Sequence, residues 1–276
     1  MQPPAGYAFG VRLRHVATYD RHVGASLERA WENVRDWEHL PFLHASSFRS
    51  IDLIESGGFG WRARIGLHPA PSAIVLELVI DQSGDRYVSR TLEGPGEGGE
   101  IWTTLSQGET KATTQVEVEF HLPGLESASQ DQADAVGASF RSLYEKLWDE
   151  DEGMMRWRAR ELEDRRRPRS DRAMRIELGS LDDLYDRLPL AINERGRRVR
   201  VALEDGQLFA HSGVCPHWLG PLAADDVGFV CPWHGYRFDR EGRSCDGHAL
   251  SLETPPRIEV DARDGQVALV WAEARG

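Results

Sequence analysis

Two short segments near the C-terminal end each pair a cysteine with a histidine. The first reads Cys215-Pro-His217 and the second reads Cys231-Pro-Trp-His234, with thirteen residues between His217 and Cys231. Thiolates are soft, strong ligands for iron, and imidazoles on a second iron leave a two-iron centre less negative than four thiolates do. The pattern therefore indicates an iron–sulfur centre with a reduction potential of roughly −150 to +300 mV.

Zinc is the alternative occupant, because two cysteines and two histidines also form structural zinc sites. A zinc finger keeps its cysteines together and its histidines together, whereas each segment here carries one of each. The arrangement resembles the Rieske [2Fe-2S] domain, whose pattern is C-x-H followed by C-x-x-H. The accessory residues of that family are also present, as Gly220, Pro221, Leu222 and Gly235. The resemblance implies a [2Fe-2S] cluster with four ligands: Cys215, His217, Cys231 and His234.

Composition limits the kind of protein. The 276 residues are enough for two domains, and the net charge of −12 argues against nucleic acid or an anionic membrane as a partner. No apolar run reaches membrane-spanning length, and residues 1–10 lack the pattern of a signal peptide, so we expect a soluble, bacterial-type cytoplasmic protein. Two of the three cysteines belong to the cluster, which leaves Cys245 alone and no pair for an intramolecular disulfide.

The rest of the chain predicts an α+β fold. Ser26 is a suitable N-cap for a helix that continues to about Glu38, and Pro41 then requires a turn near residues 39–43. Alternating runs between Ser50 and Leu122 predict strands, and a long helix should occupy roughly residues 130–165.

This order of elements resembles the helix-grip fold of the START/polyketide-cyclase superfamily, in which a curved antiparallel sheet wraps around a C-terminal helix. The run AWENVRDWEHLPFLH is similar to the first helix of that superfamily. We expect a helix-grip domain at 1–166, a linker at 167–172 and an all-β Rieske domain at 173–276.

A second group of residues suits a mononuclear iron. Asp36-Trp-Glu-His39-Leu-Pro-Phe-Leu-His44 resembles the D-x-x-H-x-x-x-x-H motif of Rieske oxygenases, in which the two histidines bind iron. The resemblance implies that Asp36 is the electron-transfer bridge between this iron and a cluster histidine. It also implies a third ligand on the closing helix, in the run Trp148-Asp149-Glu150-Asp151.

Helical periodicity orders the acids of that run. At about 100° per residue, Asp151 falls in the apolar stripe of the closing helix, whereas Asp149 and Glu152 point to the other side. The stripe comprises Val136, Phe140, Leu143, Leu147 and Met154. A buried aspartate is costly unless it is paired or bound to metal. Asp151 is therefore the predicted third ligand, with Glu150 second.

Three features depart from the oxygenase pattern. The Rieske domain comes last rather than first, and Trp218 stands where many oxygenases have an arginine. On an ideal continuous helix, Asp36 and His39 would also fall away from the apolar side formed by Leu27 and Val34, unless the turn at Pro41 redirects them.

The first functional hypothesis is a Rieske-type non-haem iron oxygenase. It would receive electrons from an NAD(P)H-dependent reductase or a ferredoxin and oxidise a hydrophobic, aromatic or polycyclic, substrate with O2. The resemblance also implies a homo-oligomer. The alternative is a Rieske electron carrier fused to a hydrophobic-ligand-binding domain without catalytic iron. A third hypothesis is a cyclase or lyase in which the cluster is structural.

Overall fold

The computed structural model describes residues 12–69, 71–166, 174–194, 196–204, 206–225 and 228–271. The chain divides into two compact units, Met1–Arg156 and Trp157–Gly276. The elements from the start through the long helix are β1 (Arg14–Val23), α1 (Leu27–Arg35), α2 (Leu40–Leu43), β2 (Phe48–Gly57), β3 (Gly60–Leu67), β4 (Ala73–Ile80), β5 (Arg86–Glu93), β6 (Glu100–Gln107), β7 (Thr114–Leu122) and α3 (Gln130–Arg166). The expected linker at 167–172 lies outside the described residues, and the expected domain boundaries remain a prediction.

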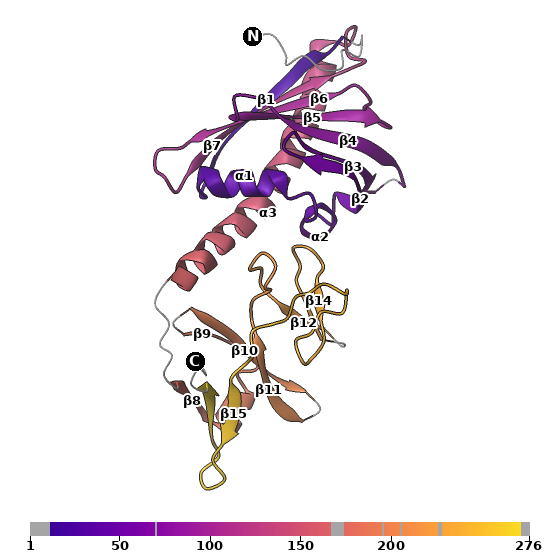
Figure 1. The fold of residues 1–276 in the computed structure, drawn as a ribbon. Coiled ribbons are helices and arrows are strands. Elements are labelled where there is room, and N and C mark those ends of the chain that lie inside the picture. Colours follow the sequence, from indigo (N-terminus) through magenta and orange to yellow (C-terminus); the bar gives the residue numbers. More distant parts are fainter. Residues whose placement is uncertain are drawn as a thin grey trace. The chain divides into compact units, whose positions relative to one another are not determined.

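The first unit is built on one antiparallel sheet of seven strands, in the order β1-β7-β6-β5-β4-β3-β2. Figure 1 shows this curved sheet with α3 passing across it. Successive side chains of a strand point to opposite faces, so only every second residue enters the core. The alternating apolar residues of β3 and β7 are buried as the sequence predicts: Trp61, Ala63, Ile65, Val116, Val118 and Phe120. The α+β architecture is confirmed.

The segment after β1 forms two helices rather than one helix and a turn. Ser26 caps α1 by accepting a hydrogen bond from a backbone N–H in the first turn. The helix ends at Arg35, before the predicted end at Glu38, and Asp36 has extended backbone. Pro41 then lies in the first turn of α2, where the missing N–H of proline costs nothing. The first helix does end before Pro41, as predicted, but residues 40–43 form a short second helix where a turn was expected.

Helix α3 packs a mostly buried stripe against the sheet. Phe140 and Tyr144 both contact Phe120, with ring centroids 5.4 and 5.0 Å apart. Leu143, which the sequence places in this stripe, is instead 38% exposed. At 100° per residue Leu143 lies about 60° from Phe140, at the edge of the stripe, whereas Tyr144 lies about 40° to the other side and makes the core contact. Asp151 is buried further along the same helix.

The second unit consists of three small antiparallel sheets, in the orders β11-β10-β9, β12-β13-β14 and β15-β16-β8. Its elements are β8 (Met174–Ser180), α4 (Leu181–Tyr185), β9 (Leu190–Glu194), β10 (Arg197–Glu204), β11 (Gln207–Ser212), β12 (Ala223–Asp225), β13 (Gly228–Val230), β14 (Arg237–Phe238), β15 (Arg257–Val260) and β16 (Gln266–Trp271). The first Cys/His segment lies between β11 and β12, and the second lies between β13 and β14. Among the helices in the described stretches, none is long and apolar enough to cross a membrane.

Candidate metal centres

The two Cys/His segments form tight loops with the same backbone pattern. Leu219 N donates to Cys215 O at 3.1 Å in the first loop, and Gly235 N donates to Cys231 O at 2.9 Å in the second. Each loop therefore turns immediately after its cysteine. This shared turn places the histidine of each loop within one turn of its cysteine.

The four expected cluster ligands are brought together in pairs. The thiols of Cys215 and Cys231 are buried and hydrogen-bonded to each other. That bond, followed by the backbone N–H groups of His217 and Trp218, lowers the pKa of Cys215, whereas the same neighbouring sulfur and burial raise the pKa of Cys231. The rings of His217 and His234 are 4.6 Å apart at 81°. A sulfur pair beside an imidazole pair fits a [2Fe-2S] cluster with two thiolates on one iron and two imidazoles on the other.

Glycine at position 220 allows the two loops to approach. A Cβ on Gly220 would lie 2.8 Å from Cys231 Sγ and 2.8 Å from the ring of Trp233. Any larger residue would therefore push the first loop away from the second cysteine. Tyr236 stacks on His217 with ring centroids 4.4 Å apart, which fixes the plane of that imidazole.

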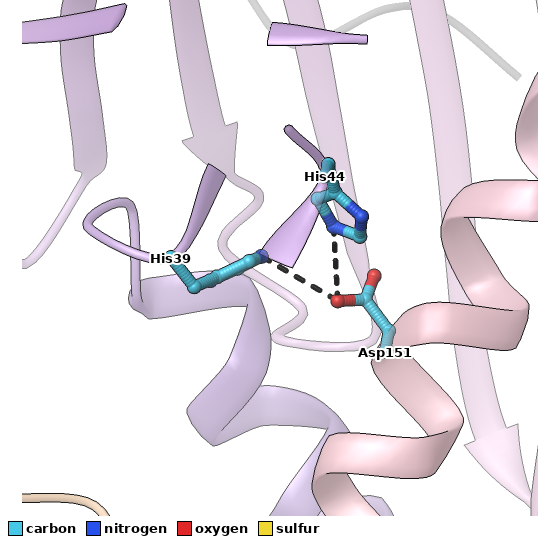
Figure 2. Close-up of side chains that lie close together, drawn as sticks. All are labelled: His39, His44 and Asp151. Atoms are coloured by element: carbon cyan, nitrogen blue, oxygen red, sulfur yellow. Dashed lines mark ion pairs between the residues drawn. The ribbon is translucent and has the colours of Figure 1, made fainter. Parts of the chain in front are cut away.

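In the first unit, His39, His44 and Asp151 converge (Figure 2). Each offers one ligand atom, these atoms all lie within 4.8 Å of one another, and all three residues are buried. Asp151 Oδ1 lies 3.1 Å from His44 Nε2 and 3.4 Å from His39 Nε2. The break between α1 and α2 makes this possible, because His39 stands at the N-cap position of α2 and does not continue the face of α1.

The two separations from Asp151 fit a metal. Ligand atoms about 2.1 Å from a metal and at right angles to one another lie about 3 Å apart. Two imidazoles and one carboxylate on one side of a metal form the facial triad of non-haem iron, which leaves positions open for other ligands. The donor set therefore suits ferrous iron.

A second set of side chains orients the three candidate ligands. His44 Nδ1 donates to Glu150 Oε2 at 2.6 Å, and Asn33 Nδ2 donates to Asp151 Oδ1 at 2.9 Å. His39 Nδ1 lies 3.4 Å from Asp36 Oδ2. His44 thus donates from one nitrogen to a carboxylate and turns the other toward Asp151, as metal-binding histidines do. Nδ1 of His39 is close to Asp36 but makes no hydrogen bond with any described residue.

The carboxylates and the imidazoles of this group stabilise one another in their charged forms. Although burial opposes the charged form, the hydrogen bond with Asp151 and the charges of Asp151 and Glu150 raise the pKa of His44. Burial likewise opposes ionisation of Asp151, but its bonds to His44 and the nearby His39 lower the pKa of that carboxyl. A pre-ionised carboxylate is the form that binds a metal.

A cavity of about 120 Å³ adjoins the triad. Its lining is mostly apolar, with residues from the sheet and from α3 that include Phe48, Trp61, Ile65, Leu76, Leu78 and Leu147. Tyr87, Ser89 and Tyr144 add hydroxyl groups. Burial raises the pKa of Tyr87 and of Tyr144, so both phenols stay protonated near neutral pH.

Two residues of this site have roles that the sequence did not assign. Asn33 stands out only as a flank of the D-x-x-H motif, yet it hydrogen-bonds Asp151. Glu150 is the second choice of iron ligand by sequence, yet it contacts the Nδ1 atom of His44, on the side of the ring away from Asp151. Asp149 and Glu152 both pair with Arg21 at 2.6 Å on the other side of α3, as the periodicity predicts.

Residues 175–256 match the family described as Rieske [2Fe-2S] domain. The chain therefore carries a Rieske domain, an electron-transfer module, after an α+β domain, and the reversed order is confirmed. Proteins of curated function include none that matches the sequence.

Solved structures similar to about half of the chain include a START superfamily protein from Mycobacterium smegmatis, with 14% identity, a TM-score of 0.43, and coverage of 51% of this chain and 99% of that one. The Zhui aromatase/cyclase from Streptomyces sp. R1128 has 14% identity and a TM-score of 0.43, covering 54% and 96%. TTHA0849 from Thermus thermophilus has 18% identity and a TM-score of 0.41, covering 50% and 94%.

Proposed function

We propose that this protein is a Rieske-type non-haem iron oxygenase that oxidises a hydrophobic substrate. The observation that carries the proposal is the buried convergence of His39, His44 and Asp151 in a chain that also has a Rieske domain. When bound, the [2Fe-2S] cluster supplies single electrons and ferrous iron supplies the activation of O2. An NAD(P)H-dependent reductase or a ferredoxin is the proposed electron donor.

The residues of the first unit would have separate roles in iron binding, ligand orientation and electron transfer. His39 Nε2, His44 Nε2 and a carboxylate oxygen of Asp151 would hold the iron, while Glu150 keeps His44 in the tautomer whose Nε2 faces the metal. Asp36, which lies 3.4 Å from His39 Nδ1, would be the residue through which an electron reaches the site.

The cavity limits the substrate. An apolar cavity of about 150 Å³ holds one benzene molecule, and drug-sized ligands require about 300 Å³ or more. The 120 Å³ beside the triad is somewhat below the first volume and far below the second, so we propose a small substrate with at most one aromatic ring rather than a polycyclic one. Tyr87 and Ser89 would hydrogen-bond one polar substituent of that ring.

Iron content of anaerobically purified protein tests the proposal. We expect about three irons per chain, and about two in the double variant His39→Ala/His44→Ala with the visible spectrum of the cluster unchanged. His68, an exposed histidine, provides the control variant His68→Ala. Two irons in the parent protein, with none lost in the double variant, would identify a Rieske electron carrier with a ligand-binding domain instead.

A further inference from the structure

The last turns of α3 hold the first cluster loop through two adjacent side chains. Trp157 Nε1 donates to Leu219 O at 2.8 Å, and Arg158 Nη1 donates to Trp218 O at 3.2 Å. The guanidinium of Arg158 also lies over the Trp218 ring, with Cζ 4.3 Å from its centroid. Consecutive residues of a helix thus bind consecutive carbonyls of the loop that follows His217.

The loop at this point has an unfavourable backbone. Leu219 has a φ of 64°, and among the described residues it is the one non-glycine in the left-handed region. Side chains other than glycine are rare there and persist where the surroundings fix them. The hydrogen bond from Trp157 is one such constraint, and it acts directly beside Gly220, which packs on Cys231.

The end of α3 also contacts strand β10 of the same compact unit. Arg198 of β10 lies over the Trp157 ring, with Cζ 4.8 Å from the centroid, and its Nε bonds the carboxylate of Glu161. Glu161 is only 1% exposed. The backbone O of Arg198 accepts from Gly213 N at 2.9 Å, just before the cluster loop begins. Trp157 therefore lies between a strand and the loop, with hydrogen bonds or ring contacts to both.

No disulfide holds the first cluster loop in place, since Cys215, Cys231 and Cys245 are all free. Arg158 stacks on the Trp218 ring, and the centroid of that ring is 5.8 Å from the centroid of the His234 ring. The positive charge of Arg158 is thus close to the imidazole side of the cluster site. A reduced cluster carries one more negative charge than an oxidised one, so a nearby cation favours reduction.

We propose that Trp157 and Arg158 are positioning residues for the [2Fe-2S] cluster. Trp157 holds the first ligand loop in its cluster-binding conformation, and Arg158 both holds that loop and raises the reduction potential. The end of α3, from Trp157 on, lies in the second compact unit and would contribute to its cluster site. This proposal does not depend on iron binding at His39, His44 and Asp151.

The full-length holoprotein tests both roles. In Trp157→Phe, which keeps the ring and removes the donor, we expect the cluster to be lost from the protein about fivefold faster, as followed by its visible absorbance. In Arg158→Leu we expect the reduction equilibrium to fall about tenfold, which is about 59 mV for one electron. Arg158→Lys, which keeps the charge, should restore most of the potential but not the cluster lifetime.

Arg160→Leu is the matched control, because it removes the same charge from an exposed position of the same helix. Its potential and cluster lifetime should equal those of the parent. Unchanged lifetime in Trp157→Phe would overturn the first role. A potential in Arg158→Leu equal to that of Arg160→Leu would overturn the second.

Discussion

Nε2 of His44 lies 3.1 Å from Oδ1 of Asp151, a contact that joins the end of α2 to the middle of α3. The neighbouring residue Glu150 reaches the other nitrogen of the same ring at 2.6 Å. Two successive acids of one helix thus bracket one imidazole. Such a bracket fixes both the position and the tautomer of a metal-binding histidine.

Changing three consecutive acids of α3 to their amides should separate their roles. Asp151→Asn removes the anionic ligand, and we expect the non-cluster iron to be lost. Glu150→Gln weakens the orientation of His44, and we expect iron affinity to fall about 10- to 100-fold. Asp149→Asn changes an exposed acid paired with Arg21 and should leave affinity unchanged. Iron titration under anaerobic conditions, with a chelator as competitor, measures all three.

Equal affinity in Glu150→Gln and Asp149→Asn would show that the contact of Glu150 with His44 does not tune a metal. Retention of three irons in folded Asp151→Asn would remove Asp151 from the ligand set. Circular dichroism of each variant establishes that the fold is intact.

Spacing along the chain could nominate the candidate ligands because each motif is local. The C-x-H and C-x-x-H patterns are matched by a Rieske domain at 175–256. Asp151 was separable from Asp149 because a helix repeats every 3.6 residues, so burial of one implies exposure of the other. The hydrogen bond from Asn33 to Asp151 has no such local signal, because the two residues meet only after α1 packs near α3.

The sequence failed where tertiary contacts override local preference. Nothing in the sequence ends α1 at Arg35, and the run to Glu38 has no strong helix breaker before Pro41. The contact of Trp157 with Leu219 O also joins segments far apart in the chain, so it carries no periodic signal. Leu143 was misplaced because it lies at the edge of the stripe, where the packing of α3 on the sheet decides which side chains are covered.

The size of the cavity predicts which ligands bind. We expect phenol to bind the protein and 1-naphthol to bind at least tenfold more weakly, as measured by isothermal titration calorimetry. Leu78→Ala removes a side chain that lines the cavity and should raise the affinity for 1-naphthol about tenfold. That variant should also lose about 2–5 kcal/mol of unfolding free energy.

Leu53→Ala, on an exposed position of β2, is the control and should bind both ligands as the parent does. Tight binding of 1-naphthol to the parent protein would contradict the size limit. Binding of neither ligand would contradict the expectation that the cavity accepts a single aromatic ring.

A buried histidine in the second unit should make stability depend on pH. His211 donates from Nδ1 to Ser212 O at 2.7 Å and stacks on Phe229 with ring centroids 4.0 Å apart. Burial lowers the pKa of His211 below its usual value of about 6.5. The unfolded chain therefore binds more protons, so the contribution is complete above about pH 6.5 and is lost as pH falls through the lowered pKa.

His211→Gln should flatten the acid side of the stability curve relative to the parent. Urea denaturation between about pH 5 and 7 measures the slope, and the exposed His68→Gln provides the comparison. A slope in His211→Gln equal to that of the parent would show that other groups dominate the dependence.

Gly220 should be the most sensitive position of the cluster loops outside the ligands. A Cβ there would lie 2.8 Å from Cys231 Sγ, a separation that Cβ atoms essentially never show. Because that sulfur is a proposed cluster ligand, we expect Gly220→Ala to displace either the loop or the thiolate. We expect cluster content to fall at least fivefold, as measured by iron, sulfide and visible absorbance. Gly58→Ala, where a Cβ meets nothing within 4 Å, should keep its full cluster content. Equal content in the two variants would show that the loops can separate without losing the cluster.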